Sequence, residues 1–585
     1  MNIDRFVNSK RTVLAVCAAV MLAAGCSGPS DAPAGGGGDE NPPPTTPPTP
    51  SPPQPDPGGA SSSAEASRFL SQATFGPSAA DIDQFQTVGA SAWMMAEFEK
   101  RHESLLESVL IAEAAGEDIG PDQLAETFWT RAIQSDDQLR QRVGFALSQI
   151  LVASYSDAEL ARRPVAMANY MDIMAAGAFG NFRQTLENVT YSPAMAIYLT
   201  YLQNQKADEA REVVPDENYA REIMQLFTIG LLELQPNGEP RLDSSGQPIE
   251  TYDNVDVTEL AKVFTGLSWA ARDRFLGRPQ SIESEYLPLV MFDDEHSEEP
   301  KSFLGVTIPA GTGGERSIDI ALDTLFNHPN TAPFISRQLI QRLVTSNPSP
   351  DYVARVANAF AAGVYQMPNG QNAGAGARGD MRAVVAAILF DAEARDTARM
   401  TGAGAGKLRE PVLRFTHWAR AFGVSDTDTD ERDVDDLQDT RAPSQLNQQA
   451  YRSPSVFNFY RPGFVAPGSE SADAGLVAPE LQITTASSVT GYANFIAEFI
   501  ARDGADGAFA SDYTEEVRLA GDPAALVDHL DLVLAYNELR PETRSRAIEA
   551  VTAITEGSGG FTRDELRARV AILFIMTSSD YIVAR

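Results

Sequence analysis

The chain has 585 residues, of which 80 are Asp or Glu and 46 are Lys or Arg, so its formal net charge is −34 at pH 7. A surface this acidic repels phosphate groups and argues against binding to nucleic acid. Both cysteines, Cys17 and Cys26, lie near the start, so the rest of the chain has no disulfide, no cysteine-ligated zinc and no iron–sulfur cluster.

The first residues have the pattern of a bacterial export signal. A basic start precedes the apolar run Thr12–Leu22, which is too short to span a bilayer, and predicts a signal peptide over 1–25. The sequence Leu22-Ala-Ala-Gly-Cys26 resembles the lipobox of bacterial lipoproteins, with the leucine one place further from the cysteine than is usual. The resemblance implies lipidation of Cys26 and a lipid-anchored cell-envelope protein, and Ser27 favours the outer membrane. The alternative is an ordinary cleaved signal that leaves Cys26 as a free thiol.

A linker separates this signal from the body. Residues 26–63 are rich in Gly, Pro, Ser and Thr, a composition that cannot form a core and predicts disorder. The remaining residues are too many for one hydrophobic core. We therefore expect two helical lobes, over 64–400 and 401–585, without a transmembrane helix.

Helical periodicity dominates the body. Apolar residues recur on one face of a helix over Leu139–Leu151, and Pro479–Ile500 predicts another long helix. Strand signal is limited to Tyr286–Phe292 and Lys301–Ile308, which we expect to pair as a hairpin. The prediction is a mainly α fold, a large multi-helix body with at most a small β-hairpin.

Three short patterns predict where helices begin. They are the capping-box sequences Ser135–Gln138, Asp256–Glu259 and Thr562–Glu565. In such a box the first and fourth side chains each accept a hydrogen bond from the backbone of the other residue.

The sequence contains no HExxH, CxxC, GxxxxGK[ST] or strand-following GxGxxG motif. Its five histidines are scattered, with no second histidine within a helical turn, which argues against a histidine-rich metal centre. Whether the chain is an enzyme, and which cofactor or metal it uses, stays open.

Several segments are distinctive when taken together. They are Ala66–Pro77, Asn218–Gly230, Asp256–Gly266, Ser453–Gly463, Ala478–Ile483 and Leu573–Arg585. In this order they resemble the bacterial family catalogued as domain of unknown function 1800, over nearly all of residues 64–585. The family has no established reaction. The resemblance implies an exported protein and a possible partner, an exported protein of the phosphatase-like domain of unknown function 1501 family, because the two are often encoded side by side.

Two of these segments supply candidate catalytic residues. On a helix from Asn218, the side chains of Asn218, Arg221 and Glu222 share one side, and Asp256 and Glu259 lie on the next helix. Carboxylates that face each other across a cleft can act as acid and base or hold a divalent cation. The candidate catalytic residues are therefore Arg221, Glu222, Asp256 and Glu259, with Asn218 as a ligand-binding residue. The alternative is that they form interhelical ion pairs and helix caps.

His296 lies among acidic residues. Members of the family usually have an Asp directly after this histidine and a Gly two places before the following lysine, where this chain has Ser297 and Glu299. His296 and the matching Lys301 are candidate ligand-binding residues. The alternative, which we favour, is a charged surface histidine whose pKa the neighbouring acids raise.

The last candidate is an aromatic loop. Tyr451, Phe459 and Tyr460 lie in a stretch rich in Pro and Gly, where aromatic faces can stack on a sugar ring or a partner. The alternative, which the alternation of Phe457 and Phe459 favours, is that the rings hold the loop onto the core.

Two functions are compatible with these patterns. The first is a cell-envelope binding or assembly factor that acts with an exported partner, which the absence of a recognisable catalytic motif favours. The second is a hydrolase that acts on an extracellular polymer through a carboxylate-lined cleft.

Overall fold

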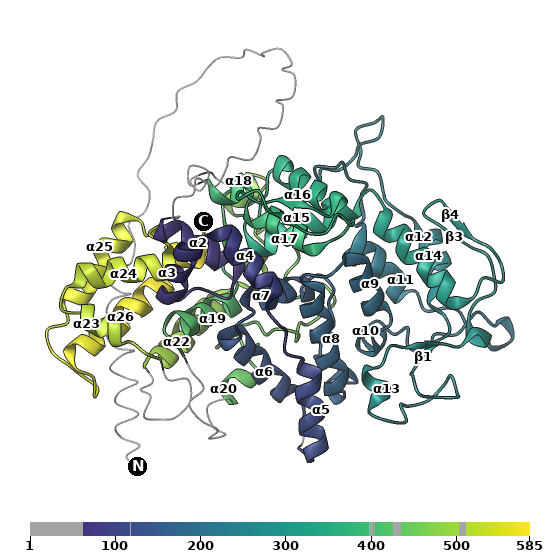
Figure 1. Cartoon of the computed structure of the whole chain (residues 1–585), viewed down its shortest axis with the longest axis horizontal. Coiled ribbons are helices and arrows are strands. Elements are labelled where there is room, and N and C mark those ends of the chain that lie inside the picture. The colour runs from purple at the N-terminus through teal and green to yellow at the C-terminus, as the bar shows by residue number, and fades with distance from the viewer. Residues whose placement is uncertain (1–61, 118, 397–401, 403, 425–434, 502–510) are drawn as a thin grey trace, which may run out of the picture.

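The computed structural model is mainly α-helical, which confirms the predicted fold class (Figure 1). The structure describes residues 62–117, 119–396, 402, 404–424, 435–501 and 511–585. The predicted signal peptide, Cys26, nearly all of the linker and the lobe boundary at 400–401 lie outside the described residues. In the described part of the chain, no helix combines the length and apolar character needed to cross a bilayer.

The α-helices follow one another in short runs. Those before residue 300 are α2 (Ser63–Ala73), α3 (Ala79–Val88), α4 (Ala90–Glu99), α5 (Leu105–Ala115), α6 (Pro121–Gln134), α7 (Gln138–Ser148), α8 (Pro164–Gly177), α9 (Phe182–Thr190), α10 (Pro193–Tyr198), α11 (Asn218–Glu222), α12 (Asn254–Ala261) and α13 (Glu283–Tyr286). Those after it are α14 (Gly314–Asn327), α15 (Thr331–Leu343), α16 (Pro350–Ala362), α17 (Met381–Leu389), α18 (Ala392–Arg395), α19 (Pro411–Ala421), α20 (Asp435–Gln438), α21 (Glu470–Asp473), α22 (Ala486–Ala501), α23 (Thr514–Leu519), α24 (Pro523–Ala535), α25 (Pro541–Thr552), α26 (Arg563–Thr577) and α27 (Ser579–Ile582).

Tighter and wider turns connect them. The 3-10 turns are η1 (Leu160–Arg162), η2 (Glu209–Arg211), η4 (Lys262–Phe264), η5 (Asp293–Glu295) and η7 (Pro479–Ile483), and η3 (Ile223–Thr228) is a π-helix. The strands form antiparallel pairs: β1 (Leu267–Ser268) with β2 (Val290–Met291), β3 (Lys301–Phe303) with β4 (Val306–Ile308), β5 (Tyr365–Gln366) with β6 (Asn372–Ala373), and β7 (Lys407–Leu408) with β8 (Val583–Ala584).

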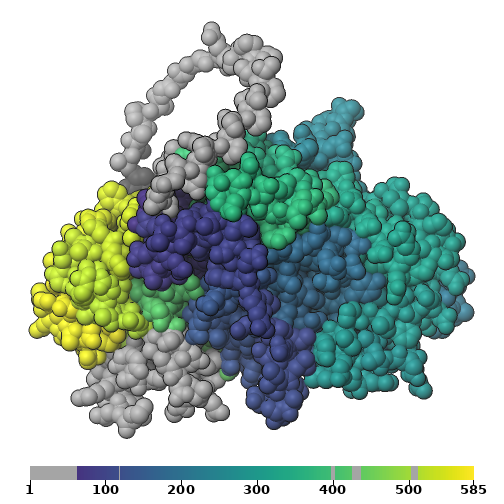
Figure 2. Space-filling view, viewed as in Figure 1, coloured from purple at the N-terminus to yellow at the C-terminus, as the bar shows by residue number. Residues whose placement is uncertain are grey.

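The body is elongated, and the start and end of the described chain meet (Figures 1 and 2). Helices α23 to α26 form one end, and α12, α14 and the β3–β4 hairpin form the other. Helix α2 packs against α24, where the Ser67 hydroxyl donates to the Leu532 carbonyl at 2.8 Å. The α2–α24 packing joins segments more than 400 residues apart, and the β7–β8 pairing joins the middle of the chain to its last residues.

A contiguous hydrophobic cluster runs through the molecule from Ala66 to Tyr581, on both sides of residue 400. Its largest members include two fully buried tryptophans, and such rings contribute roughly 2–3 kcal/mol each by burial. Their indole N–H groups are satisfied, since Trp129 donates to the Leu437 carbonyl and Trp418 to the Tyr513 hydroxyl, both at 3.0 Å.

The predicted helix starts had different outcomes. The capping box of Thr562 and Glu565 is present at the start of α26. Helix α12 begins one turn earlier than predicted, because Asp253 is the N-cap and Asp256 returns the second bond of the box. At α7 the N-cap is Asp137, whose side chain makes no capping hydrogen bond.

Two longer-range predictions were wrong. The hairpin forms within Lys301–Ile308, because Leu304 and Gly305 both adopt positive φ (47° and 77°) and close a two-residue turn, so Val290–Met291 pairs with β1 instead. The long helix expected over Pro479–Ile500 is interrupted, because Thr485 and Ser488 form a reciprocal cap that starts α22 afresh.

Candidate functional site

The described residues enclose a groove of about 380 Å³. We call it the central groove. Its walls come from the end of α7, the π-helix η3, the segment that follows it, α15 and the loop at 456–463. Two of the distinctive sequence segments, Asn218–Gly230 and Ser453–Gly463, therefore meet at one cavity.

The π-helix and one glycine shape the wall beside α15. Helix α11 widens into η3, and π-turns of this kind are frequent at functional sites. Gly230 follows with φ +71°, and a Cβ at this position would lie 2.7 Å from the ring of Phe334. A residue without a side chain lets Phe334 pack directly against the backbone and form the wall of the groove.

The wall is apolar and partly exposed. It is formed by Leu226, Leu231, Leu232, Leu234, Phe334, Val456 and Phe457. Leu231 is 55% exposed, so part of this apolar wall is open to solvent.

The floor is polar and contains atoms without a protein partner. Gln149, Gln338 and Arg342 are buried, yet Gln149 Oε1, Gln338 Nε2 and Arg342 Nε make no hydrogen bond within the described structure. Buried polar atoms are nearly always satisfied, so this floor is suited to a ligand with both donors and acceptors. Gln341 fastens the loop, since its Nε2 donates to the Pro462 carbonyl at 3.2 Å.

The rim carries positive charge. Arg337 and Arg461 are exposed, and the Arg461 guanidinium lies 4.6 Å from the centroid of the Phe457 ring. Within the described residues neither arginine forms an ion pair, and no Asp or Glu lines the groove. In a chain with a net charge of −34, this is a local reversal of sign.

A buried ionic network lies beneath the floor. Glu410 Oε2 accepts hydrogen bonds from Gln149 (2.6 Å), Gln448 (2.6 Å) and the Tyr460 hydroxyl (2.7 Å). The second acid of the network is Glu480, whose carboxylate lies 3.2 Å from Lys407 Nζ. Burial raises the pKa of Glu480 and, together with the two acids, holds the pKa of Tyr460 well above its usual value, so the phenol stays a donor.

Two arginines complete this network. Arg142 Nη2 and Lys407 Nζ both donate to the Arg342 carbonyl, at 2.6 and 2.7 Å, and Arg342 Nη2 donates to the Gln149 carbonyl at 2.9 Å. All of these side chains are nearly inaccessible to solvent. The network thus ties the groove floor to the core.

The model of one protein family matches residues 68–583, which include every segment that forms the groove. The chain belongs to the DUF1800 family. The family is described as "Protein of unknown function (DUF1800)", and this match confirms the resemblance of the sequence segments. Comparison with curated proteins and with solved structures gave no match. The function of this DUF1800 protein must therefore be argued from its site.

Among the predicted catalytic residues, Glu222 has the most unusual surroundings. It is half-buried at the end of α11, and its Oε2 is buried without a hydrogen-bond partner. Burial raises the pKa of Glu222, and Arg221 opposes the shift. The Tyr252 hydroxyl, also without a partner, is near enough for Glu222 to affect it, and burial raises its pKa to about 12. Glu222 lies one turn before Gln225 and Leu226 of the groove.

The other carboxylates have structural partners. Helices α11 and α12 pack side by side, as expected. Asp256, however, accepts from the Asp253 N–H at 3.0 Å and from the Leu304 N–H at 2.7 Å. Glu259 binds Lys262 at 2.7 Å and accepts from the Ser302 N–H at 3.0 Å. Both acids thereby anchor the β3–β4 hairpin to α12. This agrees with the alternative that these carboxylates form helix caps and ion pairs.

The polar face of α11 is also engaged. Arg221 pairs with Glu217 at 3.3 Å, and the exposed Asn218 donates from Nδ2 to the Thr200 hydroxyl at 2.7 Å. The described residues contain no group of three or more His, Cys, Asp or Glu side chains arranged to hold a metal ion.

The expectation of a charged surface His296 is wrong. The ring is 2% exposed; its Nδ1 donates to the Thr265 carbonyl at 2.9 Å, and Nε2 lies 3.2 Å from the Ser317 hydroxyl. Burial by residues distant in sequence lowers the pKa of His296 and outweighs the opposing charge of the neighbouring Asp293. Lys301 is also buried, and its Nζ donates to the Ser297 carbonyl at 2.7 Å. Both form the base of the hairpin region.

The aromatic loop divides between core and groove. Tyr460 is buried on Glu410, and the half-buried Tyr451 packs edge-on against Phe128 with 6.3 Å between ring centroids. Phe459 is half-buried, and Phe457 lines the groove. Tyr451 and Tyr460 thus hold the loop onto the core, as the alternative expected, whereas Phe457 faces a cavity that could receive a ligand.

Sequence reasoning missed Arg337, Gln338, Arg342 and Glu410. The sequence contained a signal for three polar residues of the groove floor. In the helix Thr331–Leu343, Gln338, Gln341 and Arg342 lie among apolar residues that are buried. Polar residues at core-facing positions are informative because burying them without partners is unfavourable.

Proposed function

We propose that this DUF1800 protein is a cell-envelope binding or assembly factor, and that its central groove receives an acidic, partly apolar segment of an exported partner. The observation that carries the proposal is the combination of an exposed apolar wall with Arg337 and Arg461 on the rim, and without a carboxylate in the lining. A negatively charged segment would be steered to this groove, while the acidic remainder of the surface would repel it.

The geometry favours binding over catalysis. A carboxylate pair for hydrolysis needs two free carboxyl groups on either side of the reacting bond. Asp256 and Glu259 are held in backbone hydrogen bonds and an ion pair, which leaves Glu222 as the remaining candidate. The wide, apolar groove with a polar floor has instead the composition of a recognition site.

The partner and the anchor belong to the same proposal. The sequence signal implies a lipid on Cys26 and an outer-membrane location, and the family resemblance suggests a phosphatase-like exported protein of the domain of unknown function 1501 family as partner. A Cys26→Ser variant should lose lipid at this position, as seen by mass spectrometry of the N-terminal peptide, and should leave the membrane fraction. Retention of the variant in that fraction would contradict anchoring through this residue.

Binding can be measured with this phosphatase-like protein, labelled with a fluorophore and titrated with the DUF1800 protein. The double variant Arg337→Glu/Arg461→Glu should weaken binding at least tenfold, and the affinity of the unchanged protein should fall as salt rises. Arg162→Glu is the matched control, since this exposed arginine lies outside the groove. Equal affinity of the double variant and the control would rule out the groove as the binding site.

One observation supports the second candidate, a hydrolase that acts on an extracellular polymer. Glu222 combines an unpartnered buried oxygen with a raised pKa, which is the state of a general acid. If this reading is right, Glu222→Gln abolishes release of reducing ends from polysaccharide while the melting temperature changes by only a few degrees. Loss of activity together with loss of folding would remove the argument.

A further inference from the structure

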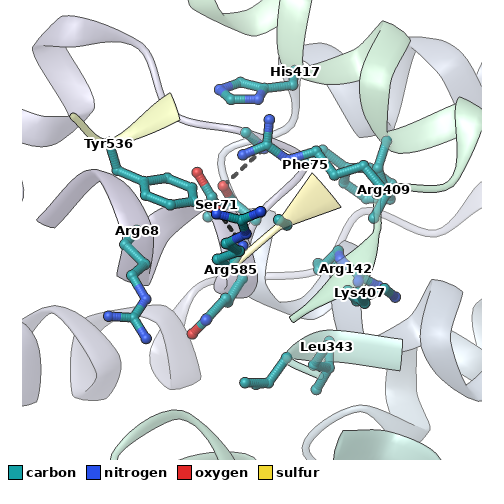
Figure 3. A pocket seen from close by; sticks show the side chains of 16 residues that line it. Arg68, Ser71, Phe75, Arg142, Leu343, Lys407, Arg409, His417, Tyr536 and Arg585 are labelled. Atoms are coloured by element: carbon teal, nitrogen blue, oxygen red, sulfur yellow. Dashed lines mark hydrogen bonds between the residues drawn. The ribbon is translucent and has the colours of Figure 1, made fainter. Parts of the chain in front are cut away.

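A second, smaller cavity adjoins the same ionic network, and we call it the inner chamber (Figure 3). Its volume is about 30 Å³. It lies where the first and last segments of the described chain meet, with α2 and the residues after it on one side and β7 and β8 on the other. Gly76 allows this close approach: it has φ +120°, and a Cβ there would lie 2.4 Å from the His417 ring.

The lining of the chamber is cationic. It includes Arg68, Arg142, Lys407, Arg409 and Arg585, and no Asp or Glu. Figure 3 shows these side chains arranged around the space, with Tyr536 and His417 beside them. Arg68, Arg142 and Arg409 are only 5%, 1% and 6% exposed. Three guanidinium groups are thus buried around a space to which the protein contributes no carboxylate side chain.

Unpartnered donors gather in this lining. The buried atoms Arg68 Nε, Ser71 Oγ, Arg142 Nε, Arg142 Nη1 and Arg409 Nη2 make no hydrogen bond to protein. The same arginines are held in place by other atoms, since Arg142 Nη2 donates to the Arg342 carbonyl at 2.6 Å and Arg409 Nη1 to the Leu534 carbonyl at 3.0 Å. Every guanidinium nitrogen carries N–H donors and none accepts a hydrogen bond, so the matching ligand is rich in acceptors.

The two nearest buried acids of the ionic network, Glu410 and Glu480, do not line the chamber. Glu480 is bound by Lys407, and Glu410 Oε2 accepts three hydrogen bonds, while Glu480 Oε2 and Glu410 Oε1 make no hydrogen bond within the described structure. His417 Nε2 donates to the Val533 carbonyl at 3.1 Å, and burial together with Arg409 lowers its pKa well below the usual value. Next to Arg68, burial and the charge of Arg68 lower the pKa of Arg395 to about 9. Within the lining itself, the side chains of Arg68, Arg142, Lys407 and Arg409 are buried and no Asp or Glu side chain is present.

The chamber adjoins a wider space. An outer pocket of about 200 Å³ shares Arg68, Gln72, Val344 and Arg585 with it, and its other lining residues include Asn347, Ser349 and one acid, Glu393. A site for one water-sized group needs roughly 10–15 Å³, so the chamber holds two or three such groups. This is the size of the oxygen atoms of a carboxylate or of part of a phosphate.

We propose that the inner chamber binds the carboxylate or phosphate group of a small molecule whose remaining atoms lie in the outer pocket. Arg142, Arg409 and Ser71 donate hydrogen bonds to the anion, and Arg68 stands at the junction of the two spaces. The site is separate from the central groove and does not depend on the function proposed for it.

The test is titration calorimetry and thermal unfolding of the purified protein with inorganic phosphate, acetate or chloride at matched ionic strength. Phosphate or acetate should bind saturably and raise the melting temperature, because a ligand that binds only the folded state stabilises it. Arg409→Gln should raise the Kd at least tenfold, and Ser71→Ala should raise it severalfold. Arg567→Gln is the matched control, a buried arginine bonded to the Ile554 and Ala520 carbonyls and remote from the chamber lining.

Three outcomes would overturn the proposal: no saturable binding of phosphate or acetate, an equal response to chloride, or unchanged affinity in Arg409→Gln and Ser71→Ala. If Arg409→Gln does not fold, Ser71→Ala and Arg409→Lys decide. The groove variant Arg337→Glu/Arg461→Glu should bind the anions as the unchanged protein does, so failure at one site is distinguishable from failure at the other.

Discussion

The central groove and the inner chamber share a framework of buried cations but balance its charge in different ways. Arg342 of the groove floor is accompanied by Glu410 and Glu480, and the same two acids lie near Arg142 and Lys407, which line the chamber. On the chamber side, no carboxylate side chain completes the lining. The difference teaches that a cavity without charged acids in its lining but with exposed cations at its rim can recognise shape and surface charge, whereas one whose charged lining side chains are buried cations is suited to an anion from outside.

The sharpest way to break this comparison is to remove the internal anion. Glu410→Gln should lower the free energy of unfolding by about 3 kcal/mol, because it leaves buried cations without their counter-ion and sets an amide against the donors of Gln149 and Gln448. Urea unfolding measures the change, with the exposed Glu159→Gln as control. A loss below about 1 kcal/mol would mean that the network does not balance its charge internally.

The groove wall provides the next largest effect. Gly230→Ala should cost about 2 kcal/mol, from the strain of a side chain at positive φ and the 2.7 Å approach to Phe334. Gly246→Ala is the matched control, since it has φ +80° but no atom within 4 Å of the added Cβ. Equal costs in the two variants, measured by chemical denaturation, would show that Phe334 yields and that the wall is not fixed by this contact.

The chamber should respond differently to loss of charge. Arg409→Met removes a hydrogen bond to Leu534 and the stacking of the guanidinium 4.4 Å from the Tyr581 ring centroid, but it also removes a buried unpaired cation. We expect these effects to offset each other and the loss to be no more than about 1 kcal/mol in the absence of ligand. Urea unfolding of Arg409→Met and Glu410→Gln tests this expectation. A loss of unfolding free energy in Arg409→Met as large as that in Glu410→Gln would remove the contrast between the two regions.

The smallest effect concerns Glu222 and depends on pH. Because burial raises its pKa in the folded state, the folded protein binds a proton more tightly than the unfolded chain. The contribution of Glu222 to stability is therefore most favourable below the ordinary pKa of 4.5 and is lost as pH rises through the folded pKa. Glu222→Gln should match the wild type at low pH and be slightly more stable at pH 7. Glu159→Gln should show the opposite trend, since Arg163 lowers the pKa of Glu159. Parallel pH profiles of Glu222→Gln and wild type would refute the burial argument.

Local patterns predicted the parts of this molecule that depend on neighbours in sequence. The helix from Asn218 buries Tyr219, Ile223 and Phe227 as its periodicity requires, and the Thr562 box caps α26. The candidate site was harder to predict. The spacing of Glu222, Asp256 and Glu259 is compatible with a cleft, but which carboxylates stay free depends on the β3–β4 hairpin, whose backbone N–H groups bind Asp256 and Glu259.

His296 shows the same limit from the other direction. Its sequence neighbours are acids, which favoured a charged histidine, but Thr265 and Ser317 bury it. Desolvation by residues far along the chain outweighs the charges of residues close to it, because those side chains can turn toward water.

By itself, the sequence determined the mainly α fold and the family, because helical periodicity and the order of segments are properties of the chain read in one dimension. Only the tertiary structure decided that residues such as Arg68, Arg142 and Arg409, or Gln225 and Phe457, line common cavities. The physical reason is that a binding site consists of donors, charges and apolar surface at defined distances, and those distances are set by packing between elements that lie hundreds of residues apart.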